Sequence, residues 1–347
     1  MLTKNNPEYF ANEAELEEAL SRPTSELIAS MRNLEGDIIL LGVAGKMGVS
    51  MAKMAKRASK AAGIERRIIG VSRFSAAGSE SYLKKNGIEI FKGDLLDISF
   101  VRDLPDVKNV IYLAGLKFGT EGKQAATWAM NSYLPGLIAD KFKNSRIVAL
   151  STGCIYPLMQ LNSMGSKETD TPNPIGEYAQ SCLGRERLFE YGSIKYGTKA
   201  ILIRLNYAVE VRYGVLVDIA TKVFQGRTLD LTMGYANVIW QADANEMILR
   251  SLDLCQSPAN YLNISGPEII SVAQVAKKFG KLMGKKVEFS GKEASTALLT
   301  NIDKSKALLG GNHTPIERVI QWTAEWILSN KPLLGKTTHF EVRDGKY

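Results

Sequence analysis

Histidine and cysteine are scarce in this sequence, and their scarcity excludes several classes of site. Only His313 and His339 occur in the 347 residues, so we expect neither a histidine-based zinc site nor a Ser-His-Asp hydrolase. Cys154, Cys182 and Cys255 are odd in number and far apart, which excludes a disulfide scaffold and any Cys-x-x-Cys metal or redox motif. The sequence therefore predicts a reduced, cytoplasmic protein that holds no metal.

Long apolar runs are also missing. The longest, such as residues 38–45, have about eight residues, whereas a membrane-spanning helix needs about 20. The N-terminal stretch is acidic and has no apolar segment, so we expect neither a secretory signal peptide nor a membrane partner. With 45% hydrophobic and 23% charged residues, the composition is typical of an ordinary globular protein.

The net charge of +8 does not by itself indicate a nucleic-acid partner. Within the densest basic stretch, Lys53, Lys56 and Lys60 fall on one face of a helix, which is typical of a solvated surface. The stretch has no interleaved aromatic residues and the chain shows no nucleic-acid-binding module, so we expect no nucleic-acid partner. A positive cleft would instead attract a small anionic ligand.

Two kinds of pattern divide the chain. Residues 1–36 show helical spacing, and Pro23 followed by Thr24 marks a helix start, so this segment predicts a helical N-terminal arm. From residue 37, short β-branched runs alternate with helical stretches, which predicts βαβ units and a parallel sheet covered on both faces. The runs are residues 38–41, 68–71, 88–91, 110–113, 147–150 and 200–203.

The alternation predicts an α/β fold class in which residues 37–205 form a Rossmann-type, doubly wound parallel sheet. After residue 204 the alternation loosens, and glycines separate shorter elements. We therefore expect residues 206–347 to form a smaller substrate-binding α/β region. It would lean over the carboxyl edge of the sheet and be partly interleaved with the first domain.

The first predicted strand runs into a glycine motif that is typical of dinucleotide binding. Gly42, Gly45 and Gly48 follow this strand and precede a helical stretch. Glycines at this spacing permit a tight turn and let a pyrophosphate approach the backbone at the helix N-terminus. A glycine-rich structural turn would not explain the spacing after a strand. We predict that the loop binds a dinucleotide through these glycines, Lys46 and Met47.

The end of the second strand bears on which dinucleotide binds. An NAD-selective site usually has Asp or Glu there to bind the ribose 2′-hydroxyl, but this sequence has Ser72 followed by Arg73. The Arg73 guanidinium can hold a 2′-phosphate, and Lys46 in the glycine loop adds positive charge nearby. We therefore predict NADP as the cofactor, with NAD as the alternative if Arg73 only stacks on the adenine.

Further motifs lie at the ends of the later strands. They are Gly93-Asp94-Leu95, Leu113-Ala114-Gly115, Ser151-Thr152-Gly153 and Tyr178. With the glycine loop, and in this order and spacing over about residues 37 to 310, they resemble the extended short-chain dehydrogenase/reductase family. This family is also called the NAD-dependent epimerase/dehydratase family.

The resemblance assigns most of these motifs to the cofactor. It implies that Asp94 and Leu95 frame the adenine and that Asn131 lies behind the active site. Along the cofactor's ribose and diphosphate it places Ala114, Gly115 and Lys117. In a doubly wound sheet the ligand lies outside the carboxyl ends of the strands, and each of these motifs is expected at such an end.

Two hydroxyl groups carry the chemistry that the resemblance implies. Thr152 would hydrogen-bond the substrate oxygen, and Tyr178 would be the general acid and base while hydride moves to or from the nicotinamide. We expect Asn206 to contact the substrate as well. The alternatives are that Thr152 is a helix or turn cap and that Tyr178 is a packing residue on an amphipathic helix.

The sequence departs from the family one helical turn after Tyr178. The family has Tyr-x-x-x-Lys, whereas Cys182 stands here in place of the lysine. That lysine lowers the pKa of the tyrosine, whose unperturbed value is about 10, so we expect slow catalysis unless another cation replaces it. Lys117 and Arg185 are the candidates. Cys182 itself is either a buried structural residue or a participating thiol.

Together these features predict an epimerase/dehydratase-type oxidoreductase that transfers hydride reversibly with NADP or NAD. The Arg–Asp pair with which nucleotide-sugar members hold the diphosphate is missing from the stretch that begins at Tyr235. We therefore expect a small carbohydrate-like substrate, a sugar or sugar acid. The alternative is a catalytically reduced dinucleotide-binding sensor or regulator. The resemblance also implies a homodimer through residues 122–140 and 176–196.

Overall fold

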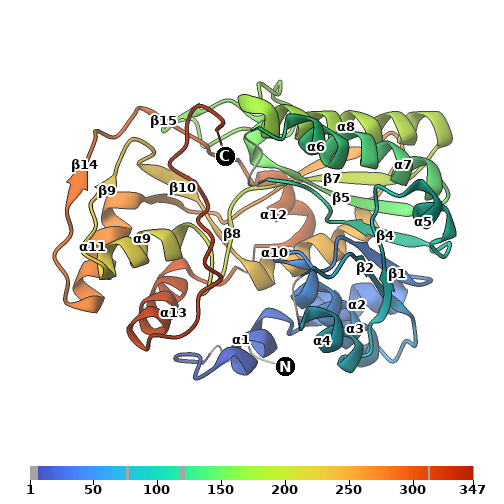
Figure 1. Cartoon of the computed structure of the whole chain (residues 1–347), viewed down its shortest axis with the longest axis horizontal. Helices are drawn as coiled ribbons and strands as arrows, with labels where there is room; N and C mark the ends of the chain where they lie inside the picture. Colours follow the sequence, from blue (N-terminus) through green and yellow to red (C-terminus); the bar gives the residue numbers. More distant parts are fainter. Residues whose placement is uncertain (1–6, 76–77, 118–121, 312, 347) are drawn as a thin grey trace.

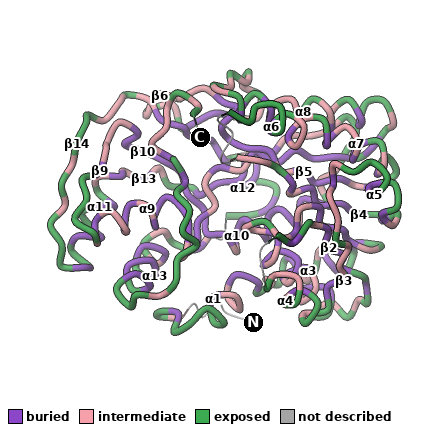
Figure 2. Tube along the Cα trace, viewed as in Figure 1, coloured by how far each residue is buried: buried purple, intermediate pink, exposed green. Residues whose placement is uncertain are grey.

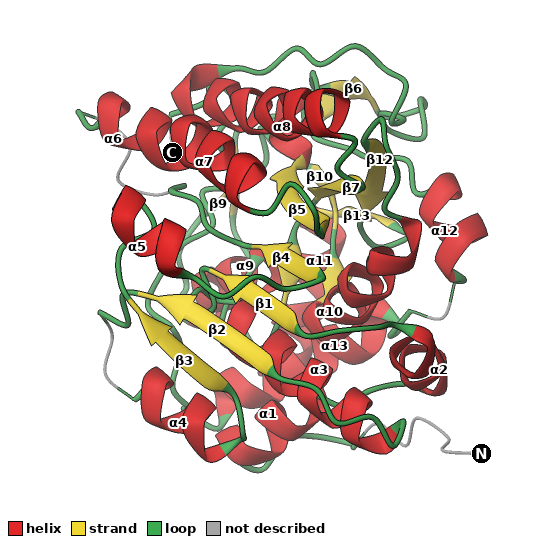
Figure 3. Ribbon diagram, turned by 90° about the vertical axis from the view of Figure 1, so that its right-hand side faces the viewer, coloured by secondary structure: helices red, strands yellow, loops and turns green. Residues whose placement is uncertain are grey.

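A seven-stranded sheet lies at the centre of the computed structural model, which describes residues 7–75, 78–117, 122–311 and 313–346. All neighbouring strands are parallel, in the order β12-β7-β5-β4-β1-β2-β3 (Figure 3). The strands are β1 (Ile38–Leu41), β2 (Ile68–Ser72), β3 (Glu89–Lys92), β4 (Asn109–Tyr112), β5 (Arg146–Thr152), β7 (Ala200–Leu205) and β12 (Asn260–Ile264). Because the strand order reverses between β1 and β4, a ligand crevice is expected at their carboxyl ends.

Six of these strands lie within two residues of the expected runs, which confirms the predicted Rossmann-type α/β class. All residues of β1 and β4 are buried, because helices cover both faces of the sheet. β12 is missing from the expected runs because Asn260 and Asn263 interrupt its apolar residues and because it lies far along the C-terminal half. It pairs with β7 and so extends the sheet from the part of the chain that we expected to form the smaller, partly interleaved region.

Helices cover the two faces in separate layers (Figures 1 and 3). One layer consists of α2 (Ser25–Asn33), α3 (Gly48–Ala61), α4 (Ser79–Lys85) and α10 (Gln241–Arg250). The other consists of α5 (Ile98–Asp103), α7 (Leu134–Lys141) and α8 (Gly176–Tyr196), with the short α6 (Gln124–Trp128) beside α8. Along β1, Ile38 and Leu40 face the first layer, whereas Ile39 and Leu41 face the second, as the two-residue period of a strand requires.

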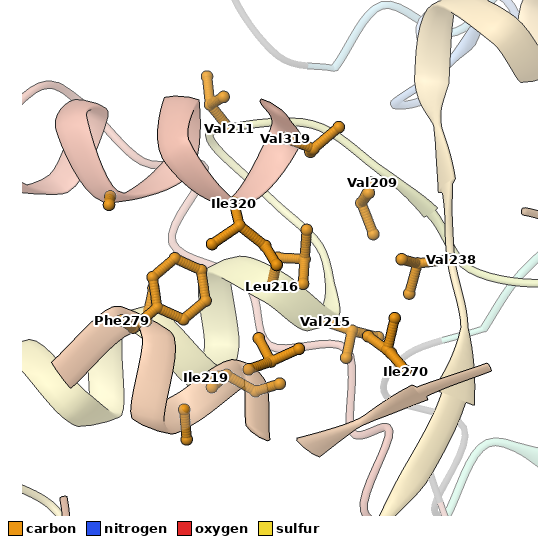
Figure 4. Packing of buried hydrophobic residues seen from close by; sticks show 14 of the residues in the cluster. Val209, Val211, Val215, Leu216, Ile219, Val238, Ile270, Phe279, Val319 and Ile320 are labelled. Atoms are coloured by element: carbon orange, nitrogen blue, oxygen red, sulfur yellow. The ribbon is translucent and has the colours of Figure 1, made fainter. Parts of the chain in front are cut away.

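A second lobe packs around its own core (Figure 4). Its helices are α9 (Val215–Phe224), α11 (Val272–Met283) and α13 (Ile316–Leu328), whereas α12 (Asp303–Leu309) lies beside β12. Its two-stranded sheets pair β8 (Ala208–Val209) with β11 (Ile239–Trp240), β9 (Leu229–Asp230) with β14 (Phe289–Ser290), and β10 (Tyr235–Asn237) with β13 (Ile269–Ser271). Leu216, Ile219, Phe279 and Ile320 bring three of the helices into contact.

Segments from each half of the sequence cross into the other lobe. β12 and α10 belong to the central sheet and its helical layer although they lie in the C-terminal half. In the opposite direction, β6 (Met159–Gln160) pairs with β15 (Thr296–Ala297). The two lobes are therefore interleaved along the chain.

The N-terminal arm joins both hydrophobic cores. α1 (Glu13–Leu20) contributes Leu16 and Leu20 to the core of the second lobe, and α2 contributes Leu27 and Met31 to the core under the sheet. The Thr24 side chain accepts a hydrogen bond from the backbone N–H of Leu27, so it caps α2 as the sequence predicts.

After α13 the chain runs back between the two lobes, where Figure 1 draws it in dark red. We call residues 332–346 the C-terminal strap. Its Thr338 donates from both its backbone N–H and its hydroxyl to Asp218 Oδ2, at 2.8 and 2.5 Å. Phe340 is buried in the core of the second lobe, while much of the strap around it is exposed (Figure 2). The strap is therefore anchored at defined points along its length.

Within the part of the chain that the structure describes, every helix is too short or too polar to span a lipid bilayer.

Candidate functional site

The glycine loop between β1 and α3 is shaped by two tightly packed glycines. Gly42 has φ +90°, and a Cβ there would lie 2.8 Å from the backbone nitrogen of Ala114. At Gly48 a Cβ would lie 2.3 Å from the carbonyl oxygen of Val43. Gly45 differs, because its Cβ would meet only the Gly42 carbonyl oxygen, at 3.2 Å. The loop is therefore packed at its two ends and open at its middle glycine.

The open side of the loop suits a pyrophosphate. α3 begins directly behind it, no side chain caps its first backbone N–H groups, and its first turn carries no acidic residue. These N–H groups and the positive end of the helix dipole favour an anion. Gly45 is exposed and leaves room for the anion to approach the backbone. The loop thus fits the dinucleotide that its sequence predicts.

At the expected adenine end, two opposite charges face each other. Ser72 ends β2, and the Arg73 guanidinium after it lies 3.7 Å from Asp94 Oδ2 at the end of β3. The two side chains are 62% and 43% exposed, so a ligand can reach both. Asp94 also accepts the backbone N–H of Leu96, which holds its carboxylate in place. A carboxylate is therefore present at this edge, although β3 supplies it rather than β2.

The prediction that Lys46 adds positive charge near Arg73 is wrong. Its Nζ donates to the carbonyl oxygen of Ala208 at 2.6 Å and lies 4.2 Å from the ring centroid of Tyr213. Both partners belong to the second lobe, so Lys46 does not add charge beside Arg73. The side chain that follows Gly45 leaves the loop toward the second lobe, because that direction offers it a carbonyl and an aromatic face.

One cavity of about 160 Å³ collects many of the predicted residues. It lies at the carboxyl ends of β5 and β7, next to the glycine loop. Six predicted site residues line it: Lys46, Met47, Lys117, Thr152, Tyr178 and Asn206. Side chains from the glycine loop, three other strand ends and a helix thus converge here, as expected of an active site at the crevice of such a sheet.

Thr152 and Tyr178 meet in this cavity. Burial raises the pKa of the Tyr178 phenol well above its usual value, and the nearby Cys182 and Cys154 raise it further. The Arg185 charge and a hydrogen bond with the Thr152 side chain oppose this rise in pKa. Thr152 Oγ1 also accepts the backbone N–H of Cys154 at 3.1 Å, so it caps the turn after β5 as well. The threonine can serve both roles.

Cys182 stands in place of the expected lysine, and Arg185 follows three residues later on the same helix, α8; both are buried. Cys182 is completely buried, and burial raises the pKa of its thiol, so a thiolate is unfavourable there. Arg185 donates to Asn131 Oδ1 at 2.8 Å and to the Leu150 carbonyl oxygen at 2.7 Å. A Cβ at Gly115 would lie 2.6 Å from its guanidinium. Arg185 thus places a buried cation near Tyr178, where its charge opposes the rise in the pKa of the phenol.

Asn131 holds the backbone that follows β4. It lies in a π-helical turn (Ala129–Tyr133) between α6 and α7. Its side chain accepts the N–H of Leu116 at 2.8 Å and donates to the carbonyl oxygen of the same residue at 2.9 Å. Its amide also donates to Ser181 Oγ at 3.0 Å. Asn131 therefore fixes the loop that carries Lys117.

Lys117 supplies a second cation, on the cavity side of Tyr178. Its Nζ lies 5.9 Å from the ring centroids of both Tyr178 and Tyr207. Arg185 thus lies near Tyr178 in the protein interior, whereas Lys117 lies near it in the cavity. Both positions that the sequence offers as substitutes for the lysine lie near Tyr178.

Sequence reasoning missed a buried ion pair beneath the cavity. Glu186 of α8 pairs with Arg204 of β7, with 2.9 Å between Arg204 Nη2 and Glu186 Oε2. Ser151 donates to Glu186 at 2.6 Å, and Arg204 donates to the Tyr156 hydroxyl at 2.7 Å. The pair therefore holds the end of β5, next to Thr152. The signal was an arginine inside the apolar run 201–205, where a charge needs a buried partner.

Several solved structures are similar to this chain over most of its length. A dTDP-glucose 4,6-dehydratase from Bacillus anthracis, in complex with NAD, is 16% identical, with a TM-score of 0.71; the match covers 85% of this chain and 97% of that one. A UDP-glucose 4-epimerase from Thermotoga maritima, with UDP-glucose, is 18% identical, with a TM-score of 0.67 and coverage of 85% and 99%. A UDP-glucuronic acid 4-epimerase from Bacillus cereus, in complex with NAD, is 15% identical, with a TM-score of 0.69 and coverage of 84% and 96%.

The chain has the fold of these epimerases and dehydratases. No protein-family model matches the chain, and neither does any curated protein. The fold that the resemblance implies is confirmed, and the chemistry has to come from the residues of the site.

Proposed function

We propose that the protein binds NAD(P) and catalyses reversible hydride transfer on a small carbohydrate-like substrate, a sugar or sugar acid. The observation that carries the proposal is the convergence of Thr152 and Tyr178 in a cavity next to the open glycine loop. Two of the solved structures with this fold, the dTDP-glucose 4,6-dehydratase and the UDP-glucuronic acid 4-epimerase, are complexes with NAD. An epimerase, a dehydratase and a dehydrogenase all need this first hydride step.

The glycine loop, the two hydroxyl groups and the two nearby cations have different parts in the reaction. A bound NAD(P) would accept or donate the hydride at its nicotinamide. Gly45, Gly48 and Met47 would hold the pyrophosphate of this cofactor. Thr152 orients the substrate oxygen by a hydrogen bond, and the Tyr178 hydroxyl exchanges a proton with the same oxygen. The Arg185 charge favours the phenolate of Tyr178. We propose that Lys117, whose Nζ lies 5.9 Å from the ring centroid, acts in the same sense, so that the two cations partly replace the lysine of the family.

The site favours a substrate smaller than a nucleotide sugar. The cavity measures about 160 Å³, and Thr338 of the C-terminal strap forms part of its wall. Asp218 fixes Thr338 through two hydrogen bonds, so this wall is well anchored. The volume leaves little space for a nucleoside diphosphate beside a nicotinamide. A sugar or sugar acid of a few carbons fits the space better.

We propose further that NADP is preferred over NAD, and Arg73→Ala tests this preference. The variant should bind NADPH about tenfold or more weakly, because a charge-assisted contact with the 2′-phosphate is lost. NADH affinity should stay unchanged, since Asp94 remains to accept the 2′-hydroxyl. Fluorescence titration with both cofactors measures the difference. An equal loss for both would show that Arg73 only stacks on the adenine.

The alternative function is a dinucleotide-binding sensor with little activity. The observations in its favour are the cysteine in place of the lysine and the raised pKa of Tyr178. Addition of a mixture of sugars and sugar acids to the cofactor-loaded protein separates the two functions. An enzyme changes the redox state of its cofactor, whereas a sensor only binds.

We propose that the chain forms a homodimer through α6, α7 and α8. Apolar side chains on α8 and in the π-helical turn before α7 reach solvent: Tyr133 in that turn is 52% exposed, and Tyr191 and Ile194 of α8 are 57% and 65% exposed. The double variant Tyr191→Glu, Ile194→Glu should therefore be monomeric by size-exclusion chromatography with light scattering. Tyr9→Glu, at a tyrosine 52% exposed on the N-terminal arm, should leave the dimer intact. A wild-type monomer at micromolar concentration would contradict the proposal.

A further inference from the structure

Lys46 occupies an unusual position for a residue of a dinucleotide-binding loop. Its side chain lines the cavity that also contains Thr152 and Tyr178. Among the described residues the structure gives its ammonium one hydrogen-bond acceptor, the Ala208 carbonyl oxygen at 2.6 Å. An ammonium has three N–H donors, so two stay available for a ligand. The Tyr213 ring, 4.2 Å away, adds a further attraction for a cation.

The acidic groups around Lys46 are committed to other partners. The Glu210 carboxylate accepts the backbone N–H of Arg212 at 2.9 Å and pairs with its guanidinium at 3.2 Å. Asp218 accepts both hydrogen bonds from Thr338. The positive charge of Lys46 therefore has no carboxylate of its own among the described residues, and the charges of Lys117 and Arg212 nearby add to it.

This arrangement makes a protonated Lys46 costly until an anion arrives. Burial lowers the pKa of Lys46 to about 7, and the positive charges of Lys117 and Arg212 also lower it, whereas Glu210 opposes them. A cation removed from water without a counter-ion is destabilised, and a bound anion would reverse this. The cavity thus contains a buried amine whose protonated form a bound anion would stabilise.

Lys117 lines the same cavity from the loop after β4, the strand that pairs with β1. Its Nζ lies 5.9 Å from the ring centroid of Tyr178, and it lines the cavity together with Lys46. An anionic group held between the two lysines would therefore lie beside the proposed acid and base. Thr338 of the strap forms part of the cavity wall, so the strap restricts the size of the ligand.

We propose that Lys46 and Lys117 bind the carboxylate of the substrate, and that the protein is specific for small hydroxy acids over neutral sugars. This inference rests on the proposed function, since it uses the same cavity. It gives Lys46 the role of a specificity-determining residue on the substrate side. Affinity for the acid should fall as the pH rises through the pKa of Lys46, because only the ammonium binds the carboxylate.

Calorimetric titration with matched acids and polyols tests the inference. The probes are glycerate, threonate and gluconate against glycerol, threitol and sorbitol, added to the protein with and without NAD(P). We expect at least one acid to bind and its polyol to bind at least tenfold more weakly. Lys46→Met should lower the affinity for that acid by about 10- to 100-fold, the range of a charge-assisted hydrogen bond. In this variant the affinity for the acid should no longer fall above pH 7.

A matched control and a cofactor titration separate the outcomes. Lys53→Met removes a lysine of α3 whose Nζ contacts the Tyr82 hydroxyl, outside the cavity, and should bind the acid like the wild type. The cofactor affinity of Lys46→Met should stay within about twofold of the wild type. Equal affinity for acid and polyol, binding of glycerol phosphate in place of the acids, or a loss of cofactor affinity in Lys46→Met would overturn the inference. Failure of the wild type to bind NAD(P) would instead overturn the proposed function.

Discussion

Tyr178→Phe should lower turnover by a factor of about 10² to 10⁴, the range that a positioned acid or base contributes. The substitution removes one hydroxyl from a buried ring, so the fold and the affinity for NAD(P) should remain. The measurement is the rate of cofactor reduction with any substrate found by screening, together with cofactor affinity by fluorescence. A small loss of rate would show that Tyr178 is a packing residue.

The pH profile follows from the raised pKa of Tyr178. Burial keeps the phenol protonated at neutral pH, and oxidation of an alcohol needs the phenolate. Below the pKa of Tyr178 the phenolate fraction rises about tenfold for each pH unit, so the oxidation rate should rise steeply on the alkaline side of neutrality. Reduction of a carbonyl needs the protonated phenol and should change little there. Lys117→Met should lower the oxidation rate more than it weakens cofactor binding.

Cys182→Ser is the matched control on the same helix. The thiol is fully buried, and burial raises its pKa, so the variant should lose little activity. If Cys182→Ser is inactive while Tyr178→Phe retains its rate, the reaction uses the thiol, and the tyrosine mechanism does not apply to this protein.

Gly45→Val should abolish binding of both NADH and NADPH while the protein stays folded. A Cβ at Gly45 meets only the Gly42 carbonyl oxygen, at 3.2 Å, so the free protein can accommodate it with a small shift. The valine would fill the space through which a pyrophosphate reaches the backbone and the N-terminus of α3. Calorimetric titration measures the loss of binding, and thermal unfolding shows whether the fold persists.

Gly48→Val gives the contrast within the same loop. A Cβ at Gly48 would lie 2.3 Å from the Val43 carbonyl oxygen, so this variant should lower the melting temperature even without cofactor. Unchanged cofactor binding in Gly45→Val would mean that the dinucleotide lies elsewhere. A drop in stability equal to that of Gly48→Val would show that Gly45 is required for the fold.

The sequence predicts the sheet well because its strands are buried on both faces. Such strands are continuous β-branched runs, and β1, β2 and β4 follow the expected residues closely. β12 was harder, since an edge strand with Asn260 and Asn263 has no such run. The glycine loop was predictable because its conformation depends on its own residues: glycine has no side chain and therefore permits the turn.

The direction of long side chains could not be read from the sequence. Lys46 could extend toward Arg73 or toward the second lobe, and the choice depends on Ala208 and Tyr213, which are distant in sequence. The C-terminal strap was equally hidden. It has no helix or strand periodicity, and Thr338 lies 120 residues from its partner Asp218 in the sequence.

Hydride transfer within the cavity of Thr152 and Tyr178 is the central claim, and the absorbance of reduced nicotinamide tests it most directly. The protein is mixed with NADP⁺ or NAD⁺ and small hydroxy acids and sugars, with Tyr178→Phe measured in parallel. We predict that reduced cofactor forms with at least one hydroxy acid in the wild type. In the variant it should form at least about 10² times more slowly. Cofactor that binds but is never reduced, or equal rates in the two proteins, would contradict the account.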